Sequence, residues 1–403
     1  MYNLRECTEK YKLYIQVLPV LFLTVGCGIN QGCFLILSFL SHVLVCRLYD
    51  YPILGNMWSS SLYRKSWLFM MVFIGTMIFP YFFNQGDISE IGHYVERMAP
   101  FLLFGIIAKD DINIPKMVWI GFIISIIYIC FDTFMHPHYI DGRLMGTFAW
   151  PLGLASVLIT MLPFLLFGII MYWKENFAFC CISFIVFVAG CHIIAMTGAR
   201  SAVIVMAVVF LGMLILIIKA QYWKALKFVI PILLIVGFGV TCFSSNVLET
   251  RIHNQLQNDG RVYLMQVSEQ IFKEYPVFGI GTKKWGEVYH NRFELPGREK
   301  NIQSPHNIFL QSANENGLIG LSGFLLLLIF QWHTMLKYGV ISMVDTLRRL
   351  NWIGGMLLCF SAIIVYGFFD YAFFGRYVMN LFWFYWGLTV FIIQRGKQVN
   401  TYD

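Results

Sequence analysis

The chain has 403 residues, of which 58% are hydrophobic and only 13% are charged, and its mean hydropathy is +0.67. This composition excludes an ordinary soluble domain and predicts a polytopic, all-α membrane protein whose helical bundle is solvated by lipid. The formal net charge of +7 is modest, so we expect no nucleic-acid partner. Nine of the ten cysteines lie in or beside apolar segments, where they are expected to act as small packing residues.

Apolar segments that reach or nearly reach the length needed to cross a bilayer predict about 12 transmembrane helices. The expected spans are 13–28, 31–48, 65–83, 93–108, 116–134, 148–171, 177–196, 201–218, 226–243, 317–336, 352–369 and 376–394.

This pattern divides one membrane domain into three parts. Residues 1–243 would hold transmembrane helices 1–9, residues 244–316 a long loop with short helices, and residues 317–403 transmembrane helices 10–12. With 12 crossings, both termini lie on one side of the membrane. The loop is too polar to span, so we expect the chemistry there and at the same membrane face.

The distribution of basic residues predicts the orientation. If the N-terminus is cytoplasmic, the cytoplasmic ends and loops collect seventeen lysines and arginines. The short loops on the other side hold only Arg97, Arg143, Arg200 and Arg376. Cytoplasmic loops are enriched in such residues, so the loop 244–316 is expected outside the cytoplasm.

The predicted spans contain almost no ionisable side chains beyond His42, His192 and His333. A secondary transporter or a proton pump would be expected to carry acids or bases near the bilayer midplane. The sequence therefore favours chemistry at the outer face over transport through the bundle.

Two features of the loop predict short helices. Gly260 and Arg261 open a run in which Leu264, Val267 and Ile271 recur at helical spacing, and Tyr275 continues it. Near the loop's end, Ser304 is expected to cap a helix with Pro305 in its first turn. This cap would place His306 in the first helical turn.

Single residues leave more than one interpretation open. Arg200, in Thr-Gly-Ala-Arg-Ser-Ala between two spans, fits an interfacial anchor that reaches the headgroups, or an anion clamp that binds phosphate oxygens. Arg261 and His306, each taken alone, fit ordinary loop residues. No Asp-x-Asp pair or His/Cys cluster with metal-ligand spacing occurs at the outer face, so no metal and no cofactor are predicted.

The motifs together are similar to one family. Thr197 to Ala202 lies at an outer span end, Gly260-Arg261 and the run Tyr275 to Gly281 lie in the loop, and Ser304 to Asn307 precedes the segment Glu315 to Gly320. In this order around a long loop they resemble the bacterial O-antigen ligase and polymerase superfamily. The length and layout are most similar to the lipopolysaccharide O-antigen ligases.

The resemblance implies roles for named residues. Arg200 and Arg261 match the arginines that bind the diphosphate of an undecaprenyl-diphosphate-linked glycan, and His306 matches the catalytic histidine. Arg143 and Arg376 look like supporting basic positions. The resemblance also implies a site at the periplasmic face of the bacterial inner membrane, working without metal or cofactor.

The implied activity is an inverting glycosyl transfer from the lipid diphosphate to a sugar hydroxyl of lipid A–core oligosaccharide, in lipopolysaccharide biosynthesis. Diphosphate leaves readily once its charge is stabilised, whereas the acceptor hydroxyl needs a base such as imidazole. A polymerase of the same superfamily, which extends another lipid-linked glycan, is the nearest alternative. A transporter of lipid-linked sugar is the alternative from another class.

Overall fold

The computed structural model describes residues 12–54, 58, 60–107, 113–220, 260–295, 302–341 and 352–399. Within these ranges the chain is almost entirely helical, and its strands form one short hairpin, which confirms the predicted mostly helical class. The predicted ninth span, 226–243, lies outside the described residues, as do residues 244–259 of the predicted loop.

The elements before the predicted loop are nine helices and one hairpin within the described ranges. They are α2 (Lys12–Ile29), α3 (Gly32–Tyr49), α4 (Ser61–Asn84), α5 (Ile88–Glu96), α6 (Ala99–Ile107), α7 (Ile114–Met135), β1 (Tyr139–Ile140), β2 (Arg143–Leu144), α8 (Pro151–Tyr172), α9 (Phe177–Thr197) and α10 (Arg200–Lys219).

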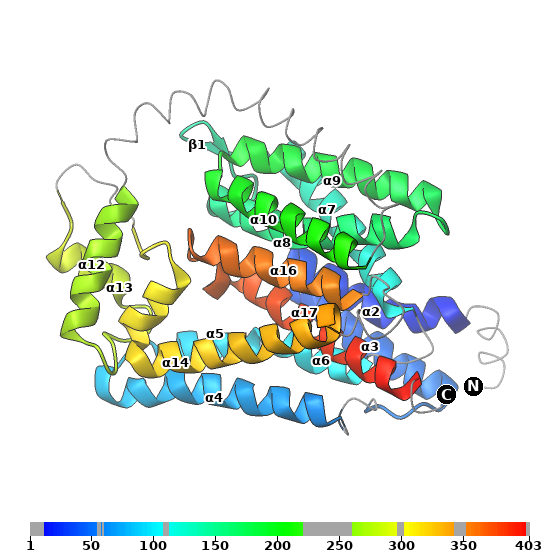
Figure 1. Cartoon of the computed structure of the whole chain (residues 1–403), viewed down its shortest axis with the longest axis horizontal. Helices are drawn as coiled ribbons and strands as arrows, with labels where there is room; N and C mark the ends of the chain where they lie inside the picture. The colour runs from blue at the N-terminus through cyan, green and yellow to red at the C-terminus, as the bar shows by residue number, and fades with distance from the viewer. Residues whose placement is uncertain are drawn as a thin grey trace.

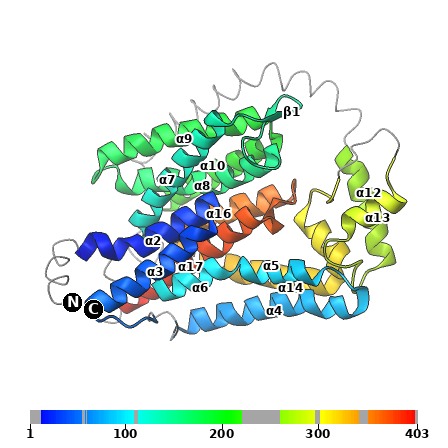
Figure 2. The same cartoon turned by 180° about the vertical axis from the view of Figure 1, so that it is seen from behind.

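The remaining described elements belong to the loop and the last spans. They are α12 (Gly260–Glu274), α13 (Trp285–Arg292), α14 (Ile308–Leu336), the π-helix η3 (Lys337–Ile341), α16 (Trp352–Gly367), the 3₁₀ turn η4 (Ala372–Phe374) and α17 (Arg376–Val399). Figures 1 and 2 show the long helices side by side, with α12 and α13 projecting beyond one end. We call this end, defined by residues 260–295 and 302–308, the loop end.

Eight of the described helices are long and apolar enough to cross a membrane, and the apolar helices Tyr14–Ile29 and Trp352–Gly367 are shorter. These helices support a multi-pass membrane protein, while the number 12 stays a prediction. Two boundaries differ from the prediction. The span 93–108 is divided into α5 and α6. Helix α14 begins at Ile308 and has a kink with non-helical φ and ψ at Gly317, where the predicted span 317–336 begins. Its polar first turns escaped a prediction based on hydropathy because they are buried against protein.

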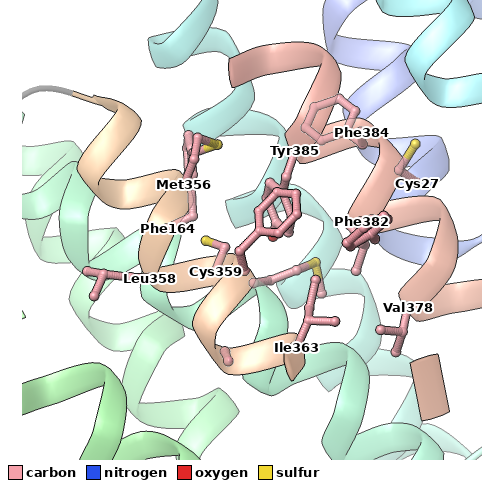
Figure 3. Packing of buried hydrophobic residues seen from close by; sticks show 14 of the residues in the cluster. Cys27, Phe164, Met356, Leu358, Cys359, Ile363, Val378, Phe382, Phe384 and Tyr385 are labelled. Carbon is pink, nitrogen blue, oxygen red and sulfur yellow. The ribbon is translucent and has the colours of Figure 1, made fainter. Parts of the chain in front are cut away.

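The core of the bundle is formed by side chains that pack closely against one another. Helix α8 is buried along nearly its whole length and contacts α7, α9, α16 and α17. Figure 3 shows Phe164 of α8 beside Cys359 of α16 and Tyr385 of α17. Close approach depends on small residues, because a Cβ on Gly168 would lie 2.4 Å from the Trp119 ring. Such packing, rather than a hydrophobic drive, holds helices together in lipid.

Candidate active site

His306 lies just before α14 and not inside it, so the predicted cap at Ser304 is wrong. The cap is Asn307, whose Oδ1 accepts hydrogen bonds from the backbone N–H groups of Phe309 (2.9 Å) and Leu310 (3.1 Å). His306 itself has a φ of 53°, in the left-handed region. A non-glycine residue adopts this conformation at a cost, and such residues concentrate at functional sites.

Asp370 is the partner of the His306 imidazole. His306 Nδ1 and Asp370 Oδ1 are 3.3 Å apart, the carboxylate is buried, and the imidazole side chain is 31% exposed. Asp370 Oδ1 also accepts the backbone N–H of Tyr371 at 2.8 Å, which fixes the carboxylate. An acceptor at Nδ1 selects the tautomer whose lone pair is on Nε2. Asp370 was not predicted as the partner of the histidine, although it is an acidic residue directly after the predicted span 352–369.

A second contact brings the same two segments together. Asn307 Nδ2 donates to the Phe368 carbonyl at 3.3 Å, beside the end of α16. The residue that caps α14 therefore also joins it to the turn that carries Asp370. The His306–Asp370 pair is thus supported by a neighbouring hydrogen bond between the same elements.

Arg143 and Arg200 flank the turn between α9 and α10. Gly198 ends α9 with a φ of 63°, a left-handed helix end that glycine adopts easily, and Arg200 begins α10 as an exposed residue. Arg143 lies in β2, and its Nε donates to the Thr197 carbonyl at 2.8 Å.

The hairpin that carries Arg143 is set by its turn. Asp141 and Gly142 have φ values of 50° and 72°, the positive pair that a two-residue hairpin requires. Ile140 pairs with Arg143 across it. The hairpin thereby directs Arg143 to the end of α9.

Arg261 lies in the first turn of α12, so the predicted helix is confirmed there. Leu264, Val267 and Ile271 are buried as expected, whereas Tyr275 lies beyond the helix and is exposed. Arg261 is in electrostatic range of the Tyr366 hydroxyl at the end of α16.

Tyr366 shows which predicted residues come together. Arg143, Arg261 and Asp370 all lie in electrostatic range of its hydroxyl, which donates to the Leu152 carbonyl at 3.1 Å. Through Asp370 this group includes His306. Arg143 and Arg261 thus act electrostatically on the same hydroxyl at the end of α16 as Asp370, which pairs with His306.

Arg376 is placed differently from the other predicted basic residues. It begins α17, and its Nη2 lies 3.6 Å from Glu96 Oε1 of α5, with both side chains at least half exposed. In the described contacts it pairs with α5 and not with the His306–Asp370 pair.

The loop is fastened to α14 by main-chain hydrogen bonds, which we call the joint (residues 276–281 with 314–319). Backbone N–H groups of Ile280 and Gly281 donate to the carbonyls of Asn314 (2.8 Å) and Glu315 (2.9 Å), and that of Leu318 donates to Pro276 (2.8 Å). A Cβ on Gly317, where φ is 65°, would lie 2.1 Å from the Val277 carbonyl oxygen. Only glycine permits this close approach.

The Glu315 side chain forms hydrogen bonds near the joint and none with His306 among the described contacts. Its buried carboxylate accepts hydrogen bonds from Gln311 Nε2 (2.5 Å) and from the backbone N–H groups of Lys283 and Trp285. Within the described ranges no group of three or more His, Cys, Asp or Glu side chains could hold a metal ion.

The helical bundle and the polar site at its end define a multi-pass membrane protein. Residues 184–325 match the family model described as O-antigen ligase, a region that contains Arg200, Arg261 and His306. The match supports the O-antigen ligase and polymerase superfamily and indicates a glycosyl-transferring enzyme. A search of curated proteins finds none that matches the chain.

Proposed function

We propose that this protein is an O-antigen ligase of the bacterial inner membrane. It transfers a preassembled glycan from undecaprenyl diphosphate to a sugar hydroxyl of lipid A–core oligosaccharide. The observation that carries the proposal is the His306–Asp370 pair at 3.3 Å, near the end of α16, where Arg143 and Arg261 act electrostatically on the Tyr366 hydroxyl. The family match over residues 184–325 supports the same chemistry.

His306 acts as the general base in this proposal. Asp370 holds Nδ1, so Nε2 accepts the proton of the acceptor hydroxyl as its oxygen attacks the anomeric carbon. The bond from that carbon to the phosphate oxygen breaks, and the electron pair leaves with the diphosphate. Attack opposite the leaving group inverts the anomeric centre.

Arg200 and Arg261 bind the diphosphate and stabilise the charge that grows as it leaves. Guanidinium groups bind phosphate oxygens through two parallel hydrogen bonds, and arginines stay charged at any relevant pH. Arg143, which is anchored to the end of α9 through Thr197, supports this positive region. Arg376, which pairs with Glu96 of α5, is given no contact with the diphosphate in this proposal. With the leaving charge neutralised by arginine, the transfer needs no metal.

The proposed site faces the periplasm, with residues 244–316 outside the cytoplasm. A cysteine introduced at the exposed Glu287 of α13 should react with an impermeant thiol reagent in intact spheroplasts. The parent protein is the control for native cysteines such as Cys33 and Cys181. Labelling that appears only after lysis would contradict this orientation.

The deciding experiment is reconstitution of the purified protein with lipid-linked glycan and core lipid. Capped core lipid is the product expected of a ligase. Longer lipid-linked chains would instead identify a polymerase, and movement of the donor without transfer would identify a carrier. His306→Ala, reconstituted in parallel, controls for contaminating transferases.

A further inference from the structure

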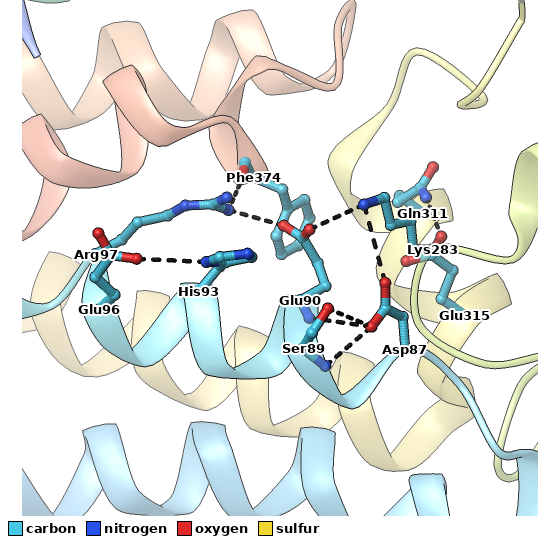
Figure 4. Close-up of polar contacts among 10 residues, drawn as sticks. All are labelled: Asp87, Ser89, Glu90, His93, Glu96, Arg97, Lys283, Gln311, Glu315 and Phe374. Atoms are coloured by element: carbon cyan, nitrogen blue, oxygen red, sulfur yellow. Dashed lines mark hydrogen bonds and ion pairs between the residues drawn. The ribbon is translucent and has the colours of Figure 1, made fainter.

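Glu90 of α5 is a buried carboxylate that contacts two cationic side chains from different parts of the chain. Its Oε1 lies 3.0 Å from Arg97 Nη1, and its Oε2 lies 3.4 Å from Lys283 Nζ (Figure 4). Glu90 is 8% exposed, whereas the Lys283 side chain is 62% exposed. The proposed chemistry gives none of these three residues a role.

One of the two contacts leads to the turn that carries Asp370. Arg97 Nη1 also donates to the Phe374 carbonyl at 2.6 Å, in the 3₁₀ turn η4 that follows Asp370. The Arg97 guanidinium lies 5.5 Å from the centre of the Tyr94 ring, which restricts its position further. Glu90 therefore restricts the position of the Arg97 guanidinium, which in turn is hydrogen-bonded to the η4 turn.

The other contact of Glu90, with Lys283, leads to the first turns of α14, which follow His306 in the chain. The backbone N–H of Lys283 donates to the buried Glu315 carboxylate, and Thr282 Oγ1 donates to Asn316 Oδ1 at 2.9 Å. Asp87, also at the start of α5, donates its backbone N–H to the Thr282 carbonyl at 3.0 Å. Lys283 thus joins Glu90 to the first turns of α14, which follow directly after His306.

We propose that Glu90 is a positioning residue for the transfer reaction. The His306–Asp370 pair bridges two segments, and Glu90 holds both of them through one carboxylate: the Asp370 turn through Arg97 and the start of α14 through Lys283. This inference rests on the proposed function. Catalytic geometry tolerates little displacement, and a misplacement of about 1 Å can cost about a hundredfold in rate.

The test uses Glu90→Gln, which keeps the shape of the side chain and removes its charge. We expect kcat for glycan transfer to fall about ten- to hundredfold, while the KM for the donor changes by less than about twofold. The KM is unaffected because the diphosphate-binding arginines keep their own contacts. A fall in kcat that only reflects lost folded protein is excluded by expressing it per mole of monodisperse protein.

Two further variants show how Glu90 acts. Lys283→Gln removes the contact with Glu90, together with the 3.9 Å pair of Lys283 with Asp87, and leaves the Glu90–Arg97 pair intact. It should lower kcat in the same direction, and Glu90→Gln combined with it should lose less than the product of the two single effects. Glu269→Gln, which breaks an exposed ion pair with Lys273 on α12, is the matched control and should keep wild-type kcat.

The outcomes separate the inference from the function beneath it. Wild-type kcat in both Glu90→Gln and Lys283→Gln, or a loss confined to donor KM, overturns the positioning role. If Glu90→Gln does not yield folded protein, unchanged kcat in Lys283→Gln is by itself sufficient to overturn the positioning role. If wild-type protein itself transfers no glycan, the proposed function fails, and the inference fails with it.

Discussion

The core of the bundle and the loop end are held together by different means. In the bundle, many polar side chains bond to carbonyls of their own helix, as when Ser125 Oγ donates to Gly121 at 2.9 Å, and a few join two helices, as when Trp119 Nε1 donates to Ser183 Oγ at 3.1 Å. At the loop end, bonds join residues far apart in the chain, such as Asn84 with Phe278 and His306 with Asp370. Close packing of side chains is therefore the main interaction between the helices of the bundle. At the loop end, hydrogen bonds and ion pairs between distant residues hold the structure together. Changes in the bundle should alter how much protein folds, and changes at the loop end should alter turnover.

The largest expected effect is at His306. His306→Ala should lower turnover by about 10² to 10⁴-fold, the usual contribution of a general base, with donor binding retained. The measurement is single-turnover transfer alongside donor binding in nanodiscs. His306→Gln distinguishes a base from a hydrogen-bond partner, and near-normal turnover in that variant would contradict the assignment.

The next effect is at the arginines proposed to bind the diphosphate. Arg200→Ala and Arg261→Ala should each lower transfer by about 10² to 10³-fold, as expected when a group that stabilises transition-state charge is removed. Lysine at either position should restore activity only in part, since a point charge lacks the two-pronged geometry of guanidinium. Transfer assays at several donor concentrations check this. Full activity in both lysine variants would indicate a bulk electrostatic role.

A smaller effect tests the joint directly. Gly317→Ala forces a side chain onto a backbone with a φ of 65° and toward the Val277 carbonyl, so strain of about 1–3 kcal/mol is expected in addition to the clash. The joint should loosen, and transfer per folded molecule should fall. Proteolysis between α12 and α13 should become faster in the same variant.

Two glycines outside the joint serve as controls for this change. Gly75→Ala in α4 meets no atom within 4 Å and should behave like wild type. Gly168→Ala meets the Trp119 ring in the bundle and should lower thermal stability while the remaining folded protein keeps its activity. Equal loss of specific activity in the Gly168 and Gly317 variants would remove the distinction between the two regions.

The smallest effect is expected at the start of α5. Asp87 caps this helix by accepting hydrogen bonds from the backbone N–H of Ser89 (2.9 Å) and from its hydroxyl (2.6 Å). Asp87→Ala should destabilise the protein by about 1 kcal/mol, measured as a lower thermal midpoint, while Asp87→Asn keeps most of the cap.

The same cap should depend on pH. The hydrogen bond from the Ser89 hydroxyl is the main cause that lowers the pKa of Asp87 below its usual value. A lowered folded-state pKa contributes stability above the unfolded-state pKa, and this contribution is lost as the pH falls through the folded-state pKa. The stability difference between wild type and Asp87→Ala should therefore shrink in acid. A difference that stays constant into acid would contradict the capping role.

The apolar spans were predictable from hydropathy, including α8, which is buried in protein along nearly its whole length. Hydropathy located α7 to α10 within a few residues because a bilayer sets their length and composition. Hydropathy placed the start of the next span at the Gly317 kink of α14, and the polar turns before the kink, where Gln311, Asn314 and Glu315 are buried, were predicted only from the capping motif.

Site residues could be predicted where they belong to a local sequence motif, but contacts between distant parts of the chain could not. The resemblance assigned His306, but its partner Asp370 lies 64 residues away, and only the packing of α14 against α16 brings them together. The cap of α14 was misplaced because both Ser304 and Asn307 are good capping residues. The positive φ of His306 decides between them, and nothing in the sequence indicates it.

The joint has a consequence for how relatives of this protein could diverge. Its hydrogen bonds run between main-chain atoms, so they depend on the path of the backbone and not on the identity of most side chains. Gly279, Gly281 and Gly317 are the positions of the joint where a side chain has no room. The residues around them could change to suit different sugars while the attachment of the loop stays the same. A backbone fastening of this kind lets substrate recognition evolve without moving the histidine.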